Sequence, residues 1–238
     1  MLWMLLAIVL LLLLCSSHAE YHGGLRNASV AAPTRPESRK ASNYYWALKI
    51  LGRNDPSPHH PNNVHLVFEI GSRDLLDGNR LADYYNATVY SFEASPSNHA
   101  TMEWSNDDER VVIVRSAVSQ KDGHVSFLAV NTSAYKNSGF GSLHEADFET
   151  NRAAGDPDYR KNGTQILIRA NSTRLDTFIR KVSKRAPDMI CMDCQESELE
   201  AVASAGELLR DVKYVIFEAA TIATYKGGNT FRYIPCPL

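Results

Sequence analysis

Four acidic residues each follow or close an apolar stretch of the chain, as polar residues do where buried strands end: Glu69, Glu93, Asp193 and Glu218. If these stretches are parallel strands of one sheet, their four carboxylates lie on one rim, where ligands of such sheets bind. Like charges held together raise each other's proton affinity unless cations or hydrogen-bond donors compensate. A ligand with hydroxyl groups and a positive centre would satisfy them. S-adenosyl-L-methionine offers ribose hydroxyls, an ammonium and a sulfonium, so we expect it as the cofactor.

The first two of these acids belong to one strand–turn–helix–strand unit, residues 64–93. A dinucleotide bound there would need helix N-terminal amides against its pyrophosphate, usually through G-x-G-x-x-G. Here Gly71 is followed by Ser72-Arg-Asp74 with no further glycine in register, and Asp77 also lies at the helix start. These acids would repel a phosphate. The unit therefore predicts a nucleoside-type cofactor without a pyrophosphate.

Predicted strands and helices alternate along the chain, which favours an α/β domain with a doubly wound, mostly parallel sheet. The expected strands are 64–69, 88–93, 110–117, 124–130, 165–170, 188–193 and 213–218, and the expected helices are 42–51, 75–86, 96–104, 173–182 and 197–209. The helix at 75–86 offers these core positions: Leu75, Leu76, Leu81 and Tyr84. Strand 110–117 is apolar enough to be buried on both faces, and we expect it to form a hairpin with 124–130. The long polar loop 131–163 is a candidate lid or substrate loop.

The bulk composition is that of one ordinary globular domain. The chain has 238 residues, 22% of them charged, and a formal net charge of -2. No basic run is long enough to follow a nucleic-acid backbone, so we expect no nucleic-acid partner. The acceptor is expected to be a small molecule or a glycan.

The N-terminus predicts entry into the secretory pathway. Residues 2–15 are almost entirely apolar but shorter than the roughly 20 residues that span a bilayer. Small residues precede a possible cut after Ala19, so residues 1–19 are either a signal peptide or a short uncleaved anchor, the only expected membrane contact. Residues 20–41 then form a flexible stem and residues 42–238 the domain. Five N-x-Ser/Thr sequons agree with this location: Asn27, Asn86, Asn131, Asn162 and Asn171.

Three cysteines remain outside the leader: Cys191, Cys194 and Cys236. Cys236 could pair with one of the other two in an oxidising lumen. The alternative, which we favour for Cys191 and Cys194, is a pair of small buried thiols on a core strand. A single C-x-x-C inside a strand is neither a typical redox motif nor a zinc site. His59 and His60 lie in a proline-rich loop and are expected to be solvated, so no metal is predicted.

A set of short motifs resembles the successive blocks of FkbM-type methyltransferases. In order along the chain, these are Phe68-Glu-Ile-Gly-Ser-Arg-Asp74, Tyr90-Ser-Phe-Glu-Ala-Ser-Pro96, Ala117-Val-Ser-Gln-Lys-Asp-Gly123, Gly141-Ser-Leu143, Arg174-Leu-Asp176 and Met192-Asp-Cys-Gln-Glu-Ser-Glu-Leu199. The resemblance covers about residues 64–225. It implies a Rossmann-like class I fold and a methyltransferase that uses S-adenosyl-L-methionine to methylate an oxygen of a small molecule or a glycan.

The resemblance also implies roles for individual residues. Glu69 and Gly71 would contact the methionine end of the cofactor, and Glu93 would hold the ribose hydroxyls. Ser116 and Ala117 would lie near the adenine. Asp193 would face the methyl-transfer centre as base or acceptor-orienting group, and its alternative role is that of a helix N-cap. Glu198 and His144 are weaker candidates for the base.

Two departures from the family pattern support a second hypothesis. Glu196 stands where the family has glycine, which is costly if that turn needs a positive φ. Only about 20 residues follow Glu218, so the C-terminal strand pair of the fold has no room, and strand 213–218 is expected to be an exposed edge. The alternative to an enzyme is therefore a non-catalytic secreted or anchored glycoprotein that keeps the fold as an interaction module.

Overall fold

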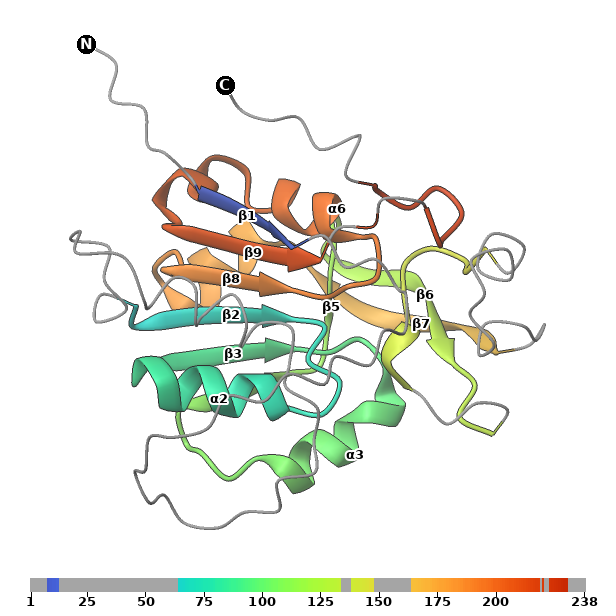
Figure 1. The fold of residues 1–238 in the computed structure, drawn as a ribbon, viewed down its shortest axis with the longest axis horizontal. Helices are drawn as coiled ribbons and strands as arrows, with labels where there is room; N and C mark the ends of the chain where they lie inside the picture. The colour runs from blue at the N-terminus through green and yellow to red at the C-terminus, as the bar shows by residue number, and fades with distance from the viewer. Residues whose placement is uncertain are drawn as a thin grey trace, which may run out of the picture.

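A six-stranded parallel sheet forms the centre of the molecule (Figure 1). The computed structural model describes residues 8–12, 64–133, 138–147, 164–218, 220 and 223–230. Across the sheet the strands are β1 (Ile8–Leu12), β9 (Tyr214–Glu218), β8 (Met189–Met192), β2 (Leu66–Ile70), β3 (Thr88–Phe92) and β4 (Val111–Val114). Chain order therefore reverses between β2 and β8, which makes that gap the switch point of a doubly wound sheet.

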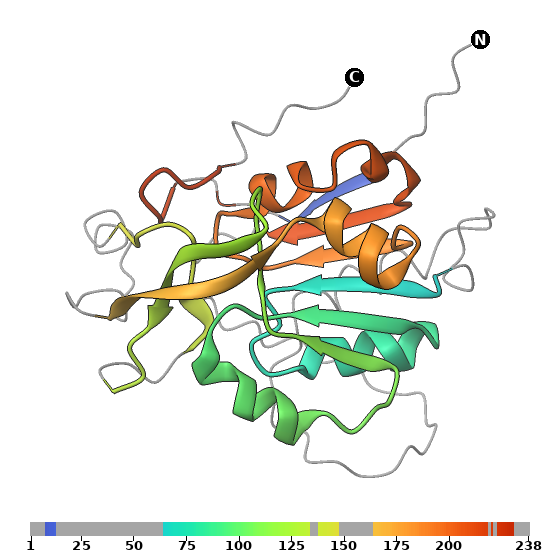
Figure 2. The ribbon, with the colours of Figure 1, turned by 180° about the vertical axis from the view of Figure 1, so that it is seen from behind.

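Helices cover both faces of this sheet, as the alternating sequence pattern predicts. On one face lie α2 (Leu76–Tyr85) and α3 (Pro96–Ser105) (Figure 1). The view from behind shows the other helices on the opposite face: α5 (Leu175–Phe178), its continuation η3 (Ile179–Ser183), α6 (Glu198–Ala203) and η4 (Gly206–Asp211) (Figure 2). The predicted Rossmann-like α/β fold is confirmed.

Strand β2 shows how the sheet holds two cores. Its side chains alternate, so Val67 packs with Leu81 beneath α2, whereas Phe68 packs with Phe178 on the other face. All five residues of β2 are buried. A central strand covered on both faces needs this continuous apolar run, which is why it was recognisable in the sequence.

The second sheet lies beyond the carboxyl ends of the central strands. It contains β5 (Ala117–Val118), β7 (Gln165–Thr173) and β6 (Gly123–Val130), and β6 pairs antiparallel with β7 (Figure 1). The predicted hairpin between 110–117 and 124–130 is therefore wrong. The chain leaves the central sheet after β4, and β6 finds its partner 35 or more residues later, a long-range pairing that no local turn signal predicts. The expectation that the third strand is buried on both faces is also wrong, because Val112 on the edge strand β4 is 39% exposed.

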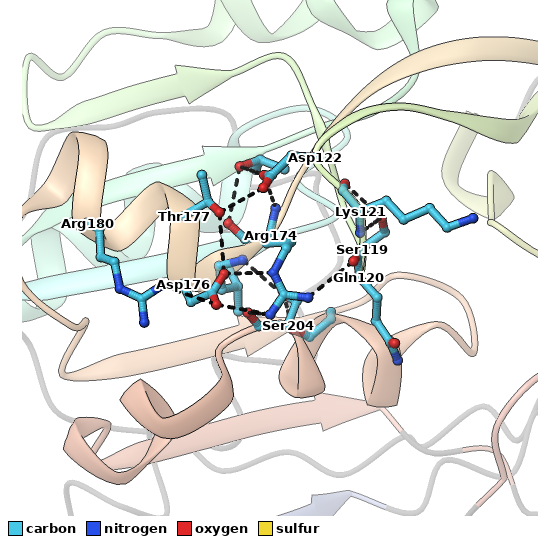
Figure 3. A network of polar contacts seen from close by, with 12 residues as sticks. Ser119, Gln120, Lys121, Asp122, Arg174, Asp176, Thr177, Arg180 and Ser204 are labelled. Atoms are coloured by element: carbon cyan, nitrogen blue, oxygen red, sulfur yellow. Dashed lines mark hydrogen bonds and ion pairs between the residues drawn. The ribbon is translucent and has the colours of Figure 1, made fainter.

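A polar network fastens this second sheet to the helices behind the central one (Figure 3). Asp122, in the β5–β6 turn, accepts hydrogen bonds from the Arg174 backbone amide (3.0 Å) and the Thr177 hydroxyl (2.8 Å) at the start of α5. The Arg174 guanidinium in turn holds both carboxylate oxygens of Asp176. The helix start that the sequence placed at Thr173–Asp176 is thus capped from a distant turn, with no side-chain cap of its own.

Three local predictions need correction. Tyr84 is 45% exposed and its neighbour Tyr85 is the buried one, because α2 presents the Leu81–Tyr85 side to the sheet. The expected helix 197–209 is two short elements, α6 and η4. The edge of β9 is not free, because β1 pairs with it in parallel.

Several predictions lie wholly or partly outside the described residues: the stem 20–41, the helix 42–51, the pair His59 and His60, most of the loop 131–163, and Cys236. Residues 8–12 of the predicted leader form β1, and cleavage of that leader stays a prediction. Within the described part of the chain, no helix has the length and apolar character needed to cross a bilayer.

Candidate active site at the carboxyl ends of the strands

A cleft opens at the switch point between β2 and β8. It encloses about 540 Å³, counting its mouth, and is lined by residues that follow β2, β3, β4 and β8 together with residues of β6 and the turn around η2. Of the residues predicted for the site, five line this cleft: Gly71, Glu93, Ser116, Ala117 and Asp193. The sheet topology therefore brings together most of the predicted site.

Gly71 joins the two sides of the cleft. Its φ is +88°, and a Cβ added there would lie 2.0 Å from the carbonyl oxygen of Asp193. Its backbone amide donates to the Phe92 carbonyl at 3.0 Å, so the turn is also tied to β3. Glycine is required here by the close approach of two backbone segments.

Glu93 is held in place by the backbone around it. One carboxylate oxygen accepts from the Arg73 amide (2.9 Å) and the other from the Ser95 amide (2.6 Å). The residue is only 6% exposed, and burial raises the pKa of its carboxyl group. The Asn98 side chain donates a third hydrogen bond to this carboxylate. A carboxylate offers about four acceptor positions, so about one stays open for a ligand hydroxyl.

Ser116 and Ala117 form the wall next to Glu93. The Ser116 hydroxyl donates to the Ala117 carbonyl at 3.0 Å, and its amide bonds back to Val114 at the end of β4. Both side chains are buried or nearly so. Both residues line the cleft with short side chains beside the acid, and their contact with an adenine stays a prediction.

Asp193 lies on the opposite side, directly after β8. Its Oδ1 accepts a 2.5 Å hydrogen bond from Nε2 of Gln195. Burial raises the pKa of Asp193 to about 6, while the Gln195 bond and the Arg73 charge oppose the rise. Arg73 is the one cationic side chain among the described residues that line the cleft. Its guanidinium donates to Asp74 at 3.0 Å, and its positive charge also acts on Asp193.

The remaining rim acids do not line the cleft. Glu198, at the start of α6, accepts the Cys194 amide at 3.0 Å, and burial raises its pKa to about 8. Burial and the Asp193 charge raise the pKa of Glu218 to about 7. Glu198 therefore lies behind Asp193, and the prediction that it acts directly on the acceptor finds no support in this geometry.

Glu69 lies beneath α2, on the Val67 side of β2. Its Oε2 accepts a 2.5 Å bond from the Ser91 hydroxyl and sits 2.7 Å from where a side chain on Gly78 would begin. Burial raises its pKa to about 8. Successive side chains of a strand alternate between the two faces, so Glu69 points toward α2 and is not part of the cleft lining. Its contact with the cofactor is implied by the resemblance alone.

His144 likewise lies away from the cleft lining. Its Nε2 is 3.4 Å from a carboxylate oxygen of Glu200 on α6, and its side chain is 20% exposed. The predicted weaker base is therefore paired elsewhere.

Glu196 adopts the positive φ that is expected to be costly for a residue other than glycine, and the hydrogen bonds of its side chain compensate for that cost. Gln195 and Glu196 have φ of 55° and 64°, the left-handed conformation that glycine adopts readily. The Glu196 carboxylate accepts from the Thr224 amide (2.7 Å), the Thr224 hydroxyl (2.6 Å) and the Tyr225 amide (3.3 Å). The Glu196 carbonyl accepts from the Asn229 amide at 3.1 Å. The residue that breaks the family pattern thus fastens the described C-terminal segment, residues 223–230, to the site.

Both described cysteines are free thiols. Cys191 is buried on β8, and Cys194 lines the cleft just beyond that strand. Burial raises the pKa of both thiols well above the usual value, which disfavours the thiolate that redox chemistry requires. The preferred interpretation as buried thiols is confirmed for Cys191, and any pairing with Cys236 lies outside the described residues.

Sequence reasoning missed three kinds of lining residue. Arg73 stood inside a quoted motif, and its positive charge among acids was a usable signal. Asn98 is 4% exposed on α3, a burial that helical periodicity alone does not reveal. Phe127 enters from β6, whose place depends on the long-range pairing with β7.

The structure is that of an open, doubly wound α/β protein, and such proteins bind their ligands in a cleft at the switch point of the sheet, as found here. A sequence model of the methyltransferase FkbM domain matches residues 80–235, and the chain belongs to that methyltransferase family. No curated protein and no solved structure gives a significant match to the chain.

Proposed function

We propose that this methyltransferase uses S-adenosyl-L-methionine to methylate a hydroxyl of a small molecule or a glycan in the secretory pathway. The observation that carries the proposal is Glu93: a buried carboxylate at the tip of β3, fixed by two backbone amides and facing the cleft. Preorganised acceptors of this kind suit a vicinal diol, and a ribose presents one. Such a site also lacks the glycine-rich turn that a pyrophosphate needs.

The other lining residues fit the remaining parts of that cofactor. Ser116 and Ala117 would flank the adenine. Arg73, whose guanidinium is bonded to Asp74, would offer its remaining N–H groups to the carboxylate of the methionine moiety, and Asp193 would face the ammonium and the sulfonium. The charges of the cleft, one cation against two acids, complement a ligand with two positive groups and one carboxylate.

The chemistry asked of the chain is modest, because the bound cofactor supplies an already activated methyl group. The chain must align the acceptor and take its proton. With a pKa of about 6, Asp193 is mostly ionised near neutral pH and is the lining residue suited to accept that proton. Because this pKa is higher than the usual value for an aspartate, Asp193 holds a proton more strongly than an ordinary carboxylate, which favours proton transfer from the acceptor hydroxyl.

A secretory location is supported by the apolar leader sequence and by the exposed sequon Asn86 at the end of α2. Asn171 is exposed too, but it lies within the paired strand β7, a position that hinders its modification. Asn131 is partly exposed at the end of β6. Membrane association would come only through an uncleaved N-terminal anchor, and residues 8–12 would then have to leave the position of β1 beside β9.

The second candidate is a non-catalytic glycoprotein that keeps the fold as an interaction module. The observation that favours it is Glu196, which replaces a family glycine and fixes the segment 223–230 beside Asp193. A rigidly held segment beside Asp193 would suit a stable binding surface for another molecule as well as it suits a catalytic centre.

Calorimetric titration of the purified full chain with S-adenosylhomocysteine tests the enzyme proposal. We expect the wild type to bind S-adenosylhomocysteine. Glu93→Ala should bind it with an affinity at least about tenfold lower than that of the wild type, because hydrogen bonds to a charged acceptor are lost. The matched control is Glu109→Ala, which removes an exposed acid of the same charge and should leave the affinity unchanged. A folded wild-type sample that binds no S-adenosylhomocysteine would leave the non-catalytic candidate.

A further inference from the structure

The C-terminal segment, residues 223–230, returns to the Asp193 side of the cleft and places one hydroxyl there. Tyr225 is 2% exposed and packs with Val130 and Phe140. Its hydroxyl lies 2.9 Å from Oε1 of Gln195 and 3.2 Å from the Phe140 carbonyl oxygen. A buried tyrosine needs such partners for its hydroxyl, and here one of them leads to the site.

Gln195 connects that hydroxyl to the candidate base. Its side-chain Nε2 donates to Asp193 Oδ1 at 2.5 Å, and its backbone carbonyl accepts from the Ser142 hydroxyl at 2.7 Å. The two ends of a side-chain amide differ, since only the nitrogen can donate to a carboxylate. The oxygen end then needs a donor, and the Tyr225 hydroxyl supplies it.

We propose that Tyr225 is a positioning residue: its hydroxyl fixes the amide of Gln195, which in turn orients the carboxylate of Asp193 at the cleft. The proposal rests on the proposed function only in giving Asp193 its catalytic task. It adds a residue outside the motifs quoted for the strand end. It also explains why Glu196 fastens the same segment, because the two bonds to Thr224 and the one to Tyr225 hold the hydroxyl in register.

We call the two successive hydrogen bonds, from Tyr225 to Gln195 and from Gln195 to Asp193, the relay. The pKa of the Asp193 carboxyl group reports whether the relay is intact. Several charged groups face this carboxyl group from the surrounding elements: Arg73 after β2, Asp77 on α2, Glu93 after β3, Glu198 on α6 and Glu218 on β9. These stay in place when the Tyr225 hydroxyl is removed. Without the Tyr225 hydroxyl, the Gln195 amide is free to rotate, so its Nε2 leaves Asp193 Oδ1 part of the time. The ionised carboxylate of Asp193 then loses stabilisation, and its pKa rises.

The test measures the pKa of Asp193 in the ligand-free full chain by a pH titration that is monitored by carboxyl ¹³C NMR. The Asp193 signal is identified as the one that is missing in Asp193→Asn. Tyr225→Phe should raise this pKa by about half a unit, the share expected of one partly lost hydrogen bond. Tyr85→Phe, at another buried tyrosine, should leave it unchanged. In a Gln195→Met background, Tyr225→Phe should add no shift, because the effect passes through Gln195.

Two results would overturn the proposal: an unchanged Asp193 pKa in a folded Tyr225→Phe variant, or an equal shift in the presence and absence of Gln195. Gln195→Met alone should raise the pKa at least as much, which keeps the relay testable if Tyr225→Phe folds poorly. S-adenosylhomocysteine titration of the same variants separates this inference from the proposed function. Failure of the wild type to bind would remove the cofactor assignment and leave the measured relay standing.

Discussion

The two sides of the cleft are built in different ways. On the β2–β3 side, Glu93 is oriented by backbone amides two and twenty residues away, inside one strand–helix–strand unit. On the β8 side, Asp193 is oriented by the Gln195 side chain, which the Tyr225 hydroxyl steadies from thirty residues downstream. The first side is a local construction, and the second depends on a distant segment folding back.

This difference affects how each side tolerates change. Backbone donors survive most substitutions, so the two amide bonds that orient Glu93 do not depend on particular side chains, and the Asn98 side chain on α3 adds a third bond. Side-chain donors are lost with a single mutation, so the geometry at Asp193 depends on Glu196, Gln195 and Tyr225 together. We therefore expect variation in this chain to alter the Asp193 side before it alters the Glu93 side.

The largest expected effect comes from forcing the two sides apart where their backbones meet. Gly71→Ala would place a Cβ 2.0 Å from the Asp193 carbonyl oxygen at a φ of +88°. We expect a loss of about 3 kcal/mol in the free energy of unfolding, measured by urea denaturation, because backbone must shift on top of the left-handed strain. Affinity for S-adenosylhomocysteine should fall with it.

The matched control is Gly123→Ala, at a φ of +103° with no atom within 4 Å of the added Cβ. It suffers the conformational strain alone, so about 1 to 2 kcal/mol is expected. Equal losses at the two glycines would show that the contact between the two sides contributes nothing.

The next effect is the pH dependence of the buried acids. The pKa of Glu198 is raised from 4.5 to about 8, so the folded state holds more protons than the unfolded state within that range. Stability therefore falls as pH rises through this range, by about 1.4 kcal/mol per unit for one such group, or about 2 kcal/mol between pH 5 and pH 6.5. Glu198→Gln should remove this share of the slope in urea denaturation series.

Glu69 supplies the comparison from the other side, because its pKa is also raised to about 8. Glu69→Gln should flatten the pH profile by a similar amount. A Glu198→Gln profile parallel to that of the wild type would mean that Glu198 is ionised in the folded chain, contrary to its burial.

The sequence predicted the central sheet well because parallel strands buried on both faces carry continuous apolar runs. It placed the ends of β2, β3, β8 and β9 within a residue or two. It also placed β6 and most of β7 as strands, but it paired β6 with the wrong partner, because the register of β6 with β7 spans a long connection that no local signal encodes. It also failed at α6, since a 13-residue amphipathic pattern does not show that the helix breaks near Ala205.

For the site, sequence could place acids at strand ends but could not say which face each side chain takes. Glu69 is within the strand and turns under α2, whereas Glu93 and Asp193 follow their strands and reach the cleft. From the sequence, the C-terminal segment is expected to add no further strand pair to the sheet. Its part in the site, through Tyr225 and Glu196, depends on contacts that only the folded chain reveals.

The smallest expected effect is the net result of two opposed terms at Glu196. Glu196→Gly relieves a left-handed residue, a gain of about 1 kcal/mol, and loses three hydrogen bonds to a carboxylate, which together contribute more. We expect a net loss of about 1 kcal/mol. Hydrogen exchange should show faster opening at the Thr224 and Tyr225 amides, with the Arg73 amide, bonded to Glu93, unchanged. Glu196→Gln keeps one acceptor and should fall in between, whereas a stabilised Glu196→Gly would mean that strain outweighs the fastening and that the Asp193 side does not depend on it.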